Sequence, residues 1–265
     1  MDAIKITAII NEKGVKAEIQ ECTKGSVRKT GIVLGEGNVR PTVYLDKINA
    51  TGTDEEIAKT IINMYHQNKE VSFEVEGITS REYVYDNCFI AVRRPVEDKA
   101  YAKDYLDMQM VVKVKVSDQA TYLLTKQMVE KLKITEDIFD IALKHMTFKL
   151  RSMSSVLGDM LDDEVADMIP EVGMFMLSTE DRVYGGAAMC DMAFIKTVAD
   201  KLDGDIVILP SSVHELLVVR YERDTNLKDL NAMVREVNTA EVDPEEQLAD
   251  HVYLYLRGSD HITMV

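Results

Sequence analysis

The sequence contains no tryptophan, only three cysteines among 265 residues, and no apolar run that approaches the length of a membrane-spanning helix. Such a helix needs about 20 consecutive apolar residues, so no membrane partner is expected. The cysteines, Cys22, Cys88 and Cys190, are far apart and form no Cys-x-x-Cys pair. Their odd number and spacing argue against a disulfide framework and a thiolate zinc site. The first residues, MDAIKITAIINEKG, also lack the pattern of a secretory signal peptide, so we expect a cytoplasmic protein.

Positive charge is scarce in the second part of the chain. Residues 1–150 carry 22 Lys and Arg against 23 Asp and Glu, whereas residues 151–265 carry 9 against 23. The net charge of −15 therefore falls almost entirely on the second part. Such a surface repels nucleic acid and anionic lipid and attracts basic proteins. We expect a basic protein partner and no direct nucleic-acid partner, with a merely solvated acidic face as the alternative.

Hydrophobic periodicity predicts a mixture of strands and helices. Alternating apolar residues predict a hairpin from Ile4 to Cys22, a strand pair on either side of Gly35, and a strand from Met110 to Val116. Helical spacing predicts a helix after Thr53, with a capping box to Glu56. Strands and helices alternate without the regular order of a parallel sheet, and hairpins are prominent.

These elements predict an α+β fold. We expect mixed, largely antiparallel sheets with hairpins packed against helices, in two consecutive lobes. The first lobe, residues 1–150, is close to neutral, and the second, residues 151–265, is strongly acidic. The acidic residues expected to contact a partner are Asp162, Asp163, Glu164, Asp167, Asp243, Glu245 and Glu246.

The stretch 209–219 (LPSSVHELLVV) resembles a fragment of an active site. Its weak catalytic candidates are His214, Glu215 and Ser212, which would serve a hydrolase. However, the serines have no glycine neighbours, which a nucleophile elbow requires. The alternative is architectural: Pro210 ends a strand, Ser212 and Glu215 form a capping box around one helical turn, and a second strand follows.

Metal and cofactor motifs are also missing. A zinc site of the His-Glu-x-x-His type needs a second histidine at position 218, which is Val218. The remaining histidines have no metal-ligand spacing. The segment Gly35-Glu-Gly37 lacks the third glycine of a dinucleotide loop, and no phosphate-binding lysine motif occurs. We therefore expect no metal and no cofactor.

Four segments of the second part resemble a known family: 179–186 (TEDRVYGG), 205–219 (DIVILPSSVHELLVV), 233–238 (MVREVN) and 242–257 (VDPEEQLADHVYLYLR). Together they are similar to DUF5688, an uncharacterised bacterial family of unknown function. The resemblance is strong over about residues 150–257 and is traceable upstream through 40–48 and 123–142. It implies an origin in Firmicutes, often near mobile genetic elements. It assigns no activity, so no catalytic residue follows from it.

Three functions follow as hypotheses. The first is a non-enzymatic cytoplasmic interaction protein whose acidic C-terminal lobe contacts a basic partner, inhibiting a nucleic-acid-binding protein in conflict between mobile elements and their host. The second is a hydrolase, which requires His214 to lie exposed in a concave site beside a carboxylate from elsewhere in the chain. The third is a small-molecule sensor, which requires a sizeable apolar pocket.

Overall fold

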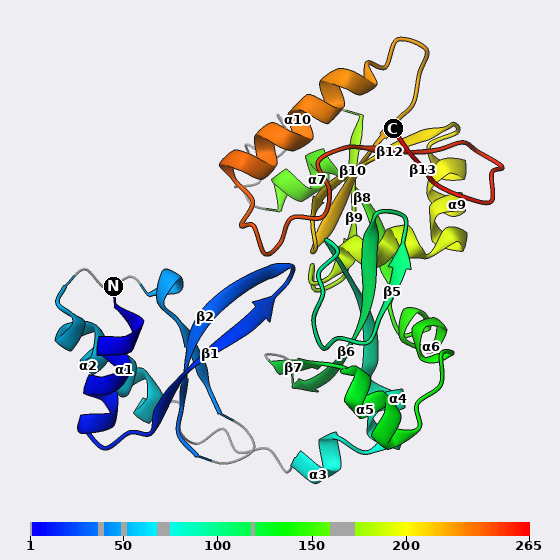
Figure 1. Cartoon of the computed structure of the whole chain (residues 1–265). Coiled ribbons are helices and arrows are strands. Elements are labelled where there is room, and N and C mark those ends of the chain that lie inside the picture. The colour runs from blue at the N-terminus through cyan, green and yellow to red at the C-terminus, as the bar shows by residue number, and fades with distance from the viewer. Residues whose placement is uncertain (1, 37–39, 49–51, 68–74, 118–119, 160–172) are drawn as a thin grey trace. The chain divides into compact units, whose positions relative to one another are not determined.

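The computed structural model of the chain describes residues 2–36, 40–48, 52–67, 75–117, 120–159 and 173–265. They form two compact units, Met1–Tyr83 and Val84–Val265 (Figure 1). The strand pairs of the three sheets are antiparallel, and helices pack against them, which confirms the α+β class. The lobe boundary expected at residue 150 falls inside the strand Phe148–Ser152, and the division into lobes 1–150 and 151–265 stays a prediction.

Unit 1 is a three-stranded sheet in the order β1-β2-β3, with helices packed against it. Its elements are α1 (Ala3–Glu12), β1 (Ala17–Lys24), β2 (Val27–Leu34), β3 (Thr42–Tyr44), the short 3-10 helix η1 (Leu45–Lys47), α2 (Asp54–Gln67) and α3 (Val75–Ile78). The core joins side chains from α1, β2 and α2, among them Ile6, Ile10, Ile32, Leu34, Ile57 and Ile61. Burial of these aliphatic side chains is the main stabilising term of the unit.

The hairpin expected from Ile4 onward is wrong, because residues Ala3–Glu12 form α1. The Asp2 side chain caps this helix by accepting hydrogen bonds from the backbone N–H groups of Ile4 and Lys5. Ile6 and Ile10, one helical turn apart, are fully buried, whereas Ile4 is 73% exposed. Isoleucine is enriched in strands, but this preference depends on the surroundings, so the cap and the contact with the core decide the conformation.

The capping box predicted for the next helix is confirmed in α2. The Thr53 backbone N–H donates to Glu56 Oε2 over 2.8 Å, and the Glu56 backbone N–H donates to Thr53 Oγ1 over 3.4 Å. The box satisfies N–H groups that the first turn of a helix leaves without partners. It therefore orients α2 so that Ile57 and Ile61 enter the core of unit 1.

Replacing Thr53 with alanine is expected to cost unit 1 about 1 kcal/mol, the usual contribution of a threonine cap. Hydrogen exchange of the α2 amides should accelerate accordingly. Thr60→Ala is the matched control, because the Thr60 hydroxyl bonds to the Glu56 carbonyl within the same helix and takes no part in the capping box. If both substitutions change exchange equally, the capping box does not stabilise α2.

Unit 2 contains two further sheets. The first has the order β4-β6-β5, with β7 paired to β6, and the second has the order β13-β12-β10-β11-β9-β8. The elements around the first sheet are α4 (Arg81–Asn87, which begins at the end of unit 1), β4 (Cys88–Arg93), β5 (Ala102–Tyr105), β6 (Met108–Ser117), β7 (Ala120–Leu123), α5 (Lys126–Leu132) and α6 (Ile138–Lys144). Those of the second are β8 (Phe148–Ser152), α7 (Met153–Gly158), β9 (Met174–Thr179), the 3-10 helix η2 (Gly185–Cys190), α9 (Met192–Lys201), β10 (Ile206–Ser212), β11 (Glu215–Arg220), α10 (Leu227–Ala240), β12 (Tyr253–Tyr255) and β13 (Thr263–Met264).

Polar contacts join these two sheets within unit 2. Asp107, in the turn between β5 and β6, accepts a hydrogen bond from the Tyr253 hydroxyl at 2.6 Å. The Nε2 atom of His251 lies 2.8 Å from the other oxygen of the same carboxylate. The Tyr105 hydroxyl donates to the Met189 carbonyl at 2.6 Å. Each contact joins residues more than 80 positions apart in sequence, so these side chains fix the packing of the two sheets.

The stretch 209–219 is a β-hairpin between β10 and β11, and it contains no helical turn. Ser212 pairs with Glu215, which leaves Val213 and His214 as the turn residues. The expectation that Pro210 ends the first strand is wrong, because β10 continues through Pro210 to Ser212. The register shifts between Leu209 and Ser212. Such an irregularity accommodates a proline, which has no N–H to give to the ladder.

Candidate functional site

His214 is held at the tip of the β10–β11 hairpin by contacts on both ring nitrogens. Nδ1 accepts a hydrogen bond from the Tyr184 backbone N–H at 3.2 Å. Nε2 lies 3.7 Å from Glu246 Oε1, and the ring packs against the Tyr184 ring at a centroid distance of 5.5 Å. The His214 side chain is 31% exposed. A carboxylate from elsewhere in the chain is thus present, as the hydrolase hypothesis requires.

The serine hydroxyls near His214 form other hydrogen bonds than the nucleophile of a serine hydrolase would form. A catalytic histidine accepts a hydrogen bond from its nucleophile through a ring nitrogen. Here Ser212 is 8% exposed, and its Oγ accepts from the His214 backbone N–H at 3.0 Å. The Ser211 Oγ reaches Glu215 at 3.5 Å. The three weak candidates therefore do not assemble into a triad in the described geometry. The hydrolase stays a prediction that this arrangement does not favour.

The carbonyl of His214 instead anchors the turn. It accepts hydrogen bonds from the Ser178 hydroxyl at 2.7 Å and from the Gly185 backbone N–H at 2.9 Å. The neighbouring Gly186 N–H donates to the Val213 carbonyl at 3.1 Å. β9, η2 and the hairpin are thereby joined through the backbone of the hairpin tip. These contacts support an architectural role for the segment.

The acidic contact residues expected from the sequence are placed unevenly. Asp162, Asp163, Glu164 and Asp167 lie outside the described residues. Asp243 is exposed, whereas Glu246 is half-buried beside His214. Glu245 is only 5% exposed, which removes its carboxylate from any exposed contact surface. Its burial was not foreseeable from an acidic run in the sequence, because the fold of the loop decides which carboxylate turns inward.

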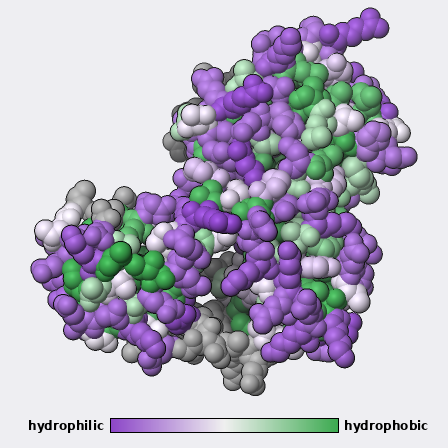
Figure 2. All heavy atoms as spheres, viewed as in Figure 1, coloured by the Kyte–Doolittle hydropathy of each residue, from purple (hydrophilic) through white to green (hydrophobic). Residues whose placement is uncertain are grey.

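An exposed face of α10 combines apolar and acidic side chains. The helix packs on the six-stranded sheet through Leu227, Leu230 and Val234, as Figure 1 shows for its position along the sheet. On its exposed side Met233 is 45% exposed and Val237 is 39% exposed. We define the α10 face as these two residues together with the exposed residues Asp229, Glu236, Ala240 and Glu241. Figure 2 shows hydrophilic residues over much of the viewed surface, with apolar patches between them. What marks the α10 face is that its apolar side chains lie among carboxylates on one helix.

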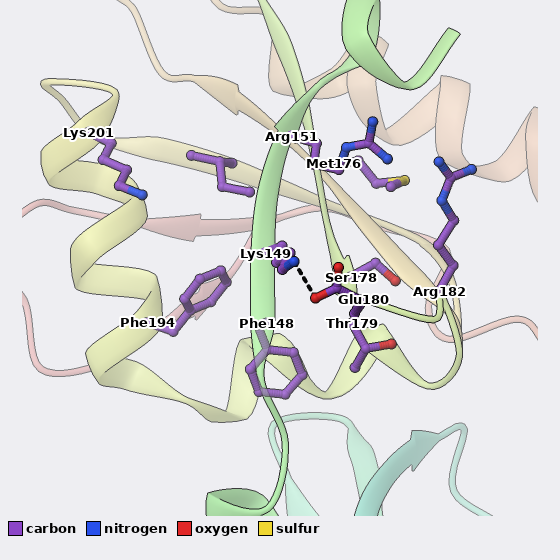
Figure 3. A pocket seen from close by; sticks show the side chains of 11 residues that line it. Phe148, Lys149, Arg151, Met176, Ser178, Thr179, Glu180, Arg182, Phe194 and Lys201 are labelled. Atoms are coloured by element: carbon purple, nitrogen blue, oxygen red, sulfur yellow. Dashed lines mark ion pairs between the residues drawn. The ribbon is translucent and has the colours of Figure 1, made fainter. Parts of the chain in front are cut away.

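A pocket of about 400 Å³ lies beside β8 (Figure 3). Its lining comes from β8, β9 and the segment after it, and α9. Four of the lining residues are cationic: Lys149, Arg151, Arg182 and Lys201. Phe148, Phe194 and Met176 contribute the apolar part. We call this the β8 pocket. The sensor hypothesis calls for an apolar pocket, whereas this one is lined by charge.

Carboxylates partly compensate the cations of the β8 pocket. Arg151 and Arg182 both bind the same Asp159 oxygen, Arg182 at 3.2 Å. The hydrogen bond from Arg151 holds the pKa of Asp159 below its usual range, and the Arg182 charge adds to this effect. Lys149 forms an ion pair with Glu180, marked in Figure 3. An anion is thus favoured between these side chains.

Sequence reasoning missed the β8 pocket because its cations are spread over three segments. A signal was present in Phe148-Lys149-Leu150-Arg151, whose alternation is typical of a strand with two cations on one side. The expected lobe boundary at residue 150 cut through this pattern. Arg182 and Lys201 belong to a turn and a helix end, and their positions relative to β8 depend on tertiary folding.

The described residues give little support to a metal site, a cysteine nucleophile or a membrane-spanning helix. No group of three or more His, Cys, Asp and Glu side chains is placed to hold a metal ion in these parts of the chain. Burial raises the pKa of the Cys88 thiol to about 11, so it is protonated and a poor nucleophile. No helix in the described ranges is both long and apolar enough to cross a membrane.

Comparison with known proteins identifies a family. The model of a family described as "Family of unknown function (DUF5688)" matches residues 4–257. The match covers both units and confirms the resemblance inferred from the C-terminal segments. No curated protein matches the chain. No solved structure matches it.

Proposed function

The chain belongs to the DUF5688 family of unknown function, and we propose from its own residues that it is a non-enzymatic interaction protein that binds a basic protein partner. The α10 face carries this proposal. Its apolar centre offers contact area, and its carboxylates offer charge complementarity. The excess of acidic residues in 151–265 also supports a positively charged partner.

The spacing of the α10 face supports an occupant with a basic amphipathic segment. Met233, Val237 and Ala240 follow one another at helical intervals and form a continuous apolar line. Asp229 and Glu236 flank this line on one side, and Glu241 lies on the other. A partner helix with an apolar stripe between Lys and Arg residues would match both features.

The basic residues of α10 do not interrupt this face. At 3.6 residues per turn, Lys228 and Arg235 lie on the flank opposite to Met233. The Arg235 Nε donates to the Asp250 carbonyl at 3.1 Å, which holds its guanidinium against the following loop. The face is therefore negative around an apolar centre, and long-range attraction to a basic partner should be screened over about 8 Å at physiological salt.

The proposed partner is a nucleic-acid-binding protein, and the proposed setting is the cytoplasm of a bacterium that carries mobile elements. Nucleic-acid-binding proteins are rich in exposed Lys and Arg, so we propose one of them as the basic partner, inhibited when its binding surface is covered. The expected bacterial, mobile-element setting supports a role in conflict between elements and host. The free cysteines support the cytoplasm as the compartment.

The test measures binding of a labelled lysine-rich amphipathic helical peptide by fluorescence anisotropy. We expect wild-type protein to bind it, and Glu236→Lys to weaken binding about tenfold, because one attractive contact becomes repulsive. Affinity should fall as salt rises from low to physiological concentration. Wild type and Glu236→Lys should also be used as baits for affinity capture from the native host. We expect a basic protein to bind the wild type and to be absent from the capture with Glu236→Lys.

Asp260→Lys is the matched control, since it gives the same kind of charge reversal on an exposed loop that pairs with Lys196. A scrambled peptide of equal charge controls for unspecific attraction. If Glu236→Lys and Asp260→Lys weaken binding equally, the effect comes from the overall charge of the protein. That result would contradict binding at the α10 face. A further variant, with Asp162, Asp163, Glu164 and Asp167 changed to their amides, tests the contact residues expected from the sequence.

A further inference from the structure

The β8 pocket gathers positive charge in a part of the chain that has little. Residues 151–265 contain nine Lys and Arg residues, and three of them, Arg151, Arg182 and Lys201, line this one pocket. Lys149 adds a fourth cation from the same strand. An acidic protein that concentrates its few cations around one hollow creates a local field opposite to its net charge.

The arrangement of these cations suits an oxyanion. Two guanidiniums, from β8 and from the turn after β9, converge on a single oxygen of Asp159. Guanidinium groups bind carboxylate and phosphate oxygens through directed N–H donors. With Asp159 and Glu180 counted, four cations face two carboxylates, so two positive charges remain for a ligand. The Asp159 side chain is half-exposed, so it can leave the two guanidinium groups when an anion that binds them more tightly takes its place.

Two aromatic rings line the pocket on the side of α9. The rings of Phe148 and Phe194 pack at a centroid distance of 5.7 Å with an interplanar angle of 40°. In Figure 3, Phe194 and Lys201 extend from α9 on one side of β8, and Arg151 and Arg182 lie on the other side. The volume of about 400 Å³ falls in the range of small-molecule sites. The pocket therefore offers an aromatic side, where Phe194 is the more accessible ring and Phe148 is buried behind it, and a cationic side.

We propose that the β8 pocket binds an anionic ligand with an aromatic ring, of the nucleoside phosphate class. The base packs against Phe194, which the buried Phe148 supports from behind, and the phosphates take the place of the Asp159 carboxylate between Arg151 and Arg182. Lys149 and Lys201 supply further positive charge. This site differs from the α10 face in its elements and in the sign of its ligand, so it goes beyond the proposed partner binding.

The test uses calorimetric titration of the full chain at physiological salt with three probes: adenosine diphosphate, pyrophosphate and adenosine. We expect the nucleotide to bind more tightly than either fragment. Arg182→Gln and Lys201→Gln should each weaken nucleotide binding, Arg182→Gln by about tenfold or more, because a charge-assisted hydrogen bond is lost. Phe194→Leu should weaken the nucleotide and leave pyrophosphate unchanged, which separates ring contact from charge.

Arg257→Gln is the matched control, because Arg257 pairs with Asp200 and Asp203 and does not line the pocket. Its nucleotide affinity should equal that of the wild type. Thermal unfolding confirms that each variant is folded, and Lys201→Gln, on an exposed helix end, carries the test if Arg182→Gln is unstable. Absence of nucleotide binding below about 1 mM would overturn the proposal. Equal binding in wild type and pocket variants, or pyrophosphate binding as tight as the nucleotide, would do the same.

Discussion

Gly185→Ala is expected to lower the free energy of unfolding of unit 2 by about 3 kcal/mol, the upper part of the range for overpacking a well-filled site. A Cβ atom at Gly185 would lie 2.4 Å from the Ser178 Oγ, 2.5 Å from the His214 carbonyl oxygen and 2.5 Å from the Ser178 Cα. Two of these three atoms belong to the backbone, so no side-chain rotation relieves the contact. Relief requires β9 or the β10–β11 hairpin to shift.

Urea unfolding followed by circular dichroism measures this effect. Gly204→Ala is the matched control within unit 2, because the nearest atom to its Cβ, at 3.0 Å, belongs to the flexible Arg220 side chain. We expect its unfolding midpoint to remain close to that of the wild type. If Gly185→Ala shows the same midpoint as this control, the close approach of η2 to the hairpin tip does not constrain the fold.

The second large effect is expected at Asp107. Removal of its carboxylate in Asp107→Ala leaves the largely buried Tyr253 hydroxyl and the His251 Nε2 without their partner. Hydrogen bonds to a charged group contribute about 1.5 to 3 kcal/mol. The Asp107 side chain is 37% exposed, so solvent screens part of this contribution, and we expect a loss of about 2 kcal/mol at neutral pH.

This loss should depend on pH in a defined direction. Burial alone raises the pKa of Asp107, but the hydrogen bonds from Tyr253 and His251 outweigh it, and the pKa lies below its usual value. A carboxyl group whose pKa is lower in the folded state stabilises the protein above its unfolded pKa, about 3.9. That stabilisation declines as the pH falls through the folded-state pKa. The difference between wild type and Asp107→Ala should therefore be full at pH 7 and shrink below about pH 4.

Unfolding curves at several pH values between neutral and acid check this dependence. Tyr253→Phe is a useful comparison, because it removes only the hydroxyl and keeps the buried ring. It should show a smaller loss at neutral pH than Asp107→Ala. A difference between wild type and Asp107→Ala that stays constant down to acid pH would indicate that the charge of Asp107 is irrelevant to its role.

Features encoded by neighbouring residues were predictable from the sequence. The capping box of Thr53 and Glu56 closes within one helical turn, so its pattern survives any tertiary arrangement. The Asp191 cap of α9 behaves in the same way, because its carboxylate accepts from the Phe194 N–H three residues on. The strand predicted from Met110 to Val116 was likewise confirmed as β6, because its alternating apolar residues are a local signal.

Features that depend on distant residues were not predictable. The apolar residues of α1 alternate briefly as in a strand, and their contact with α2 and β2, together with the Asp2 cap, selects the helix. The burial of Glu245 and the pairing of His214 with Glu246 both depend on how the loop after α10 folds back on the hairpin. The β8 pocket combines three separate segments, 148–151, 176–182 and 194–201, and a single sequence does not show that they meet in space.

The position of β8 has a consequence for solubility. In the strand order of the described residues it is the last strand of its sheet and pairs on one side only, with β9. Terminal strands invite pairing with another chain, and proteins counter this with charged side chains, especially lysine. Lys149 and Arg151 alternate with Phe148 and Leu150 along β8 and so act as gatekeepers against intermolecular strand addition. The same two charges thus serve both ligand attraction and protection from aggregation, which limits how freely either residue can be exchanged.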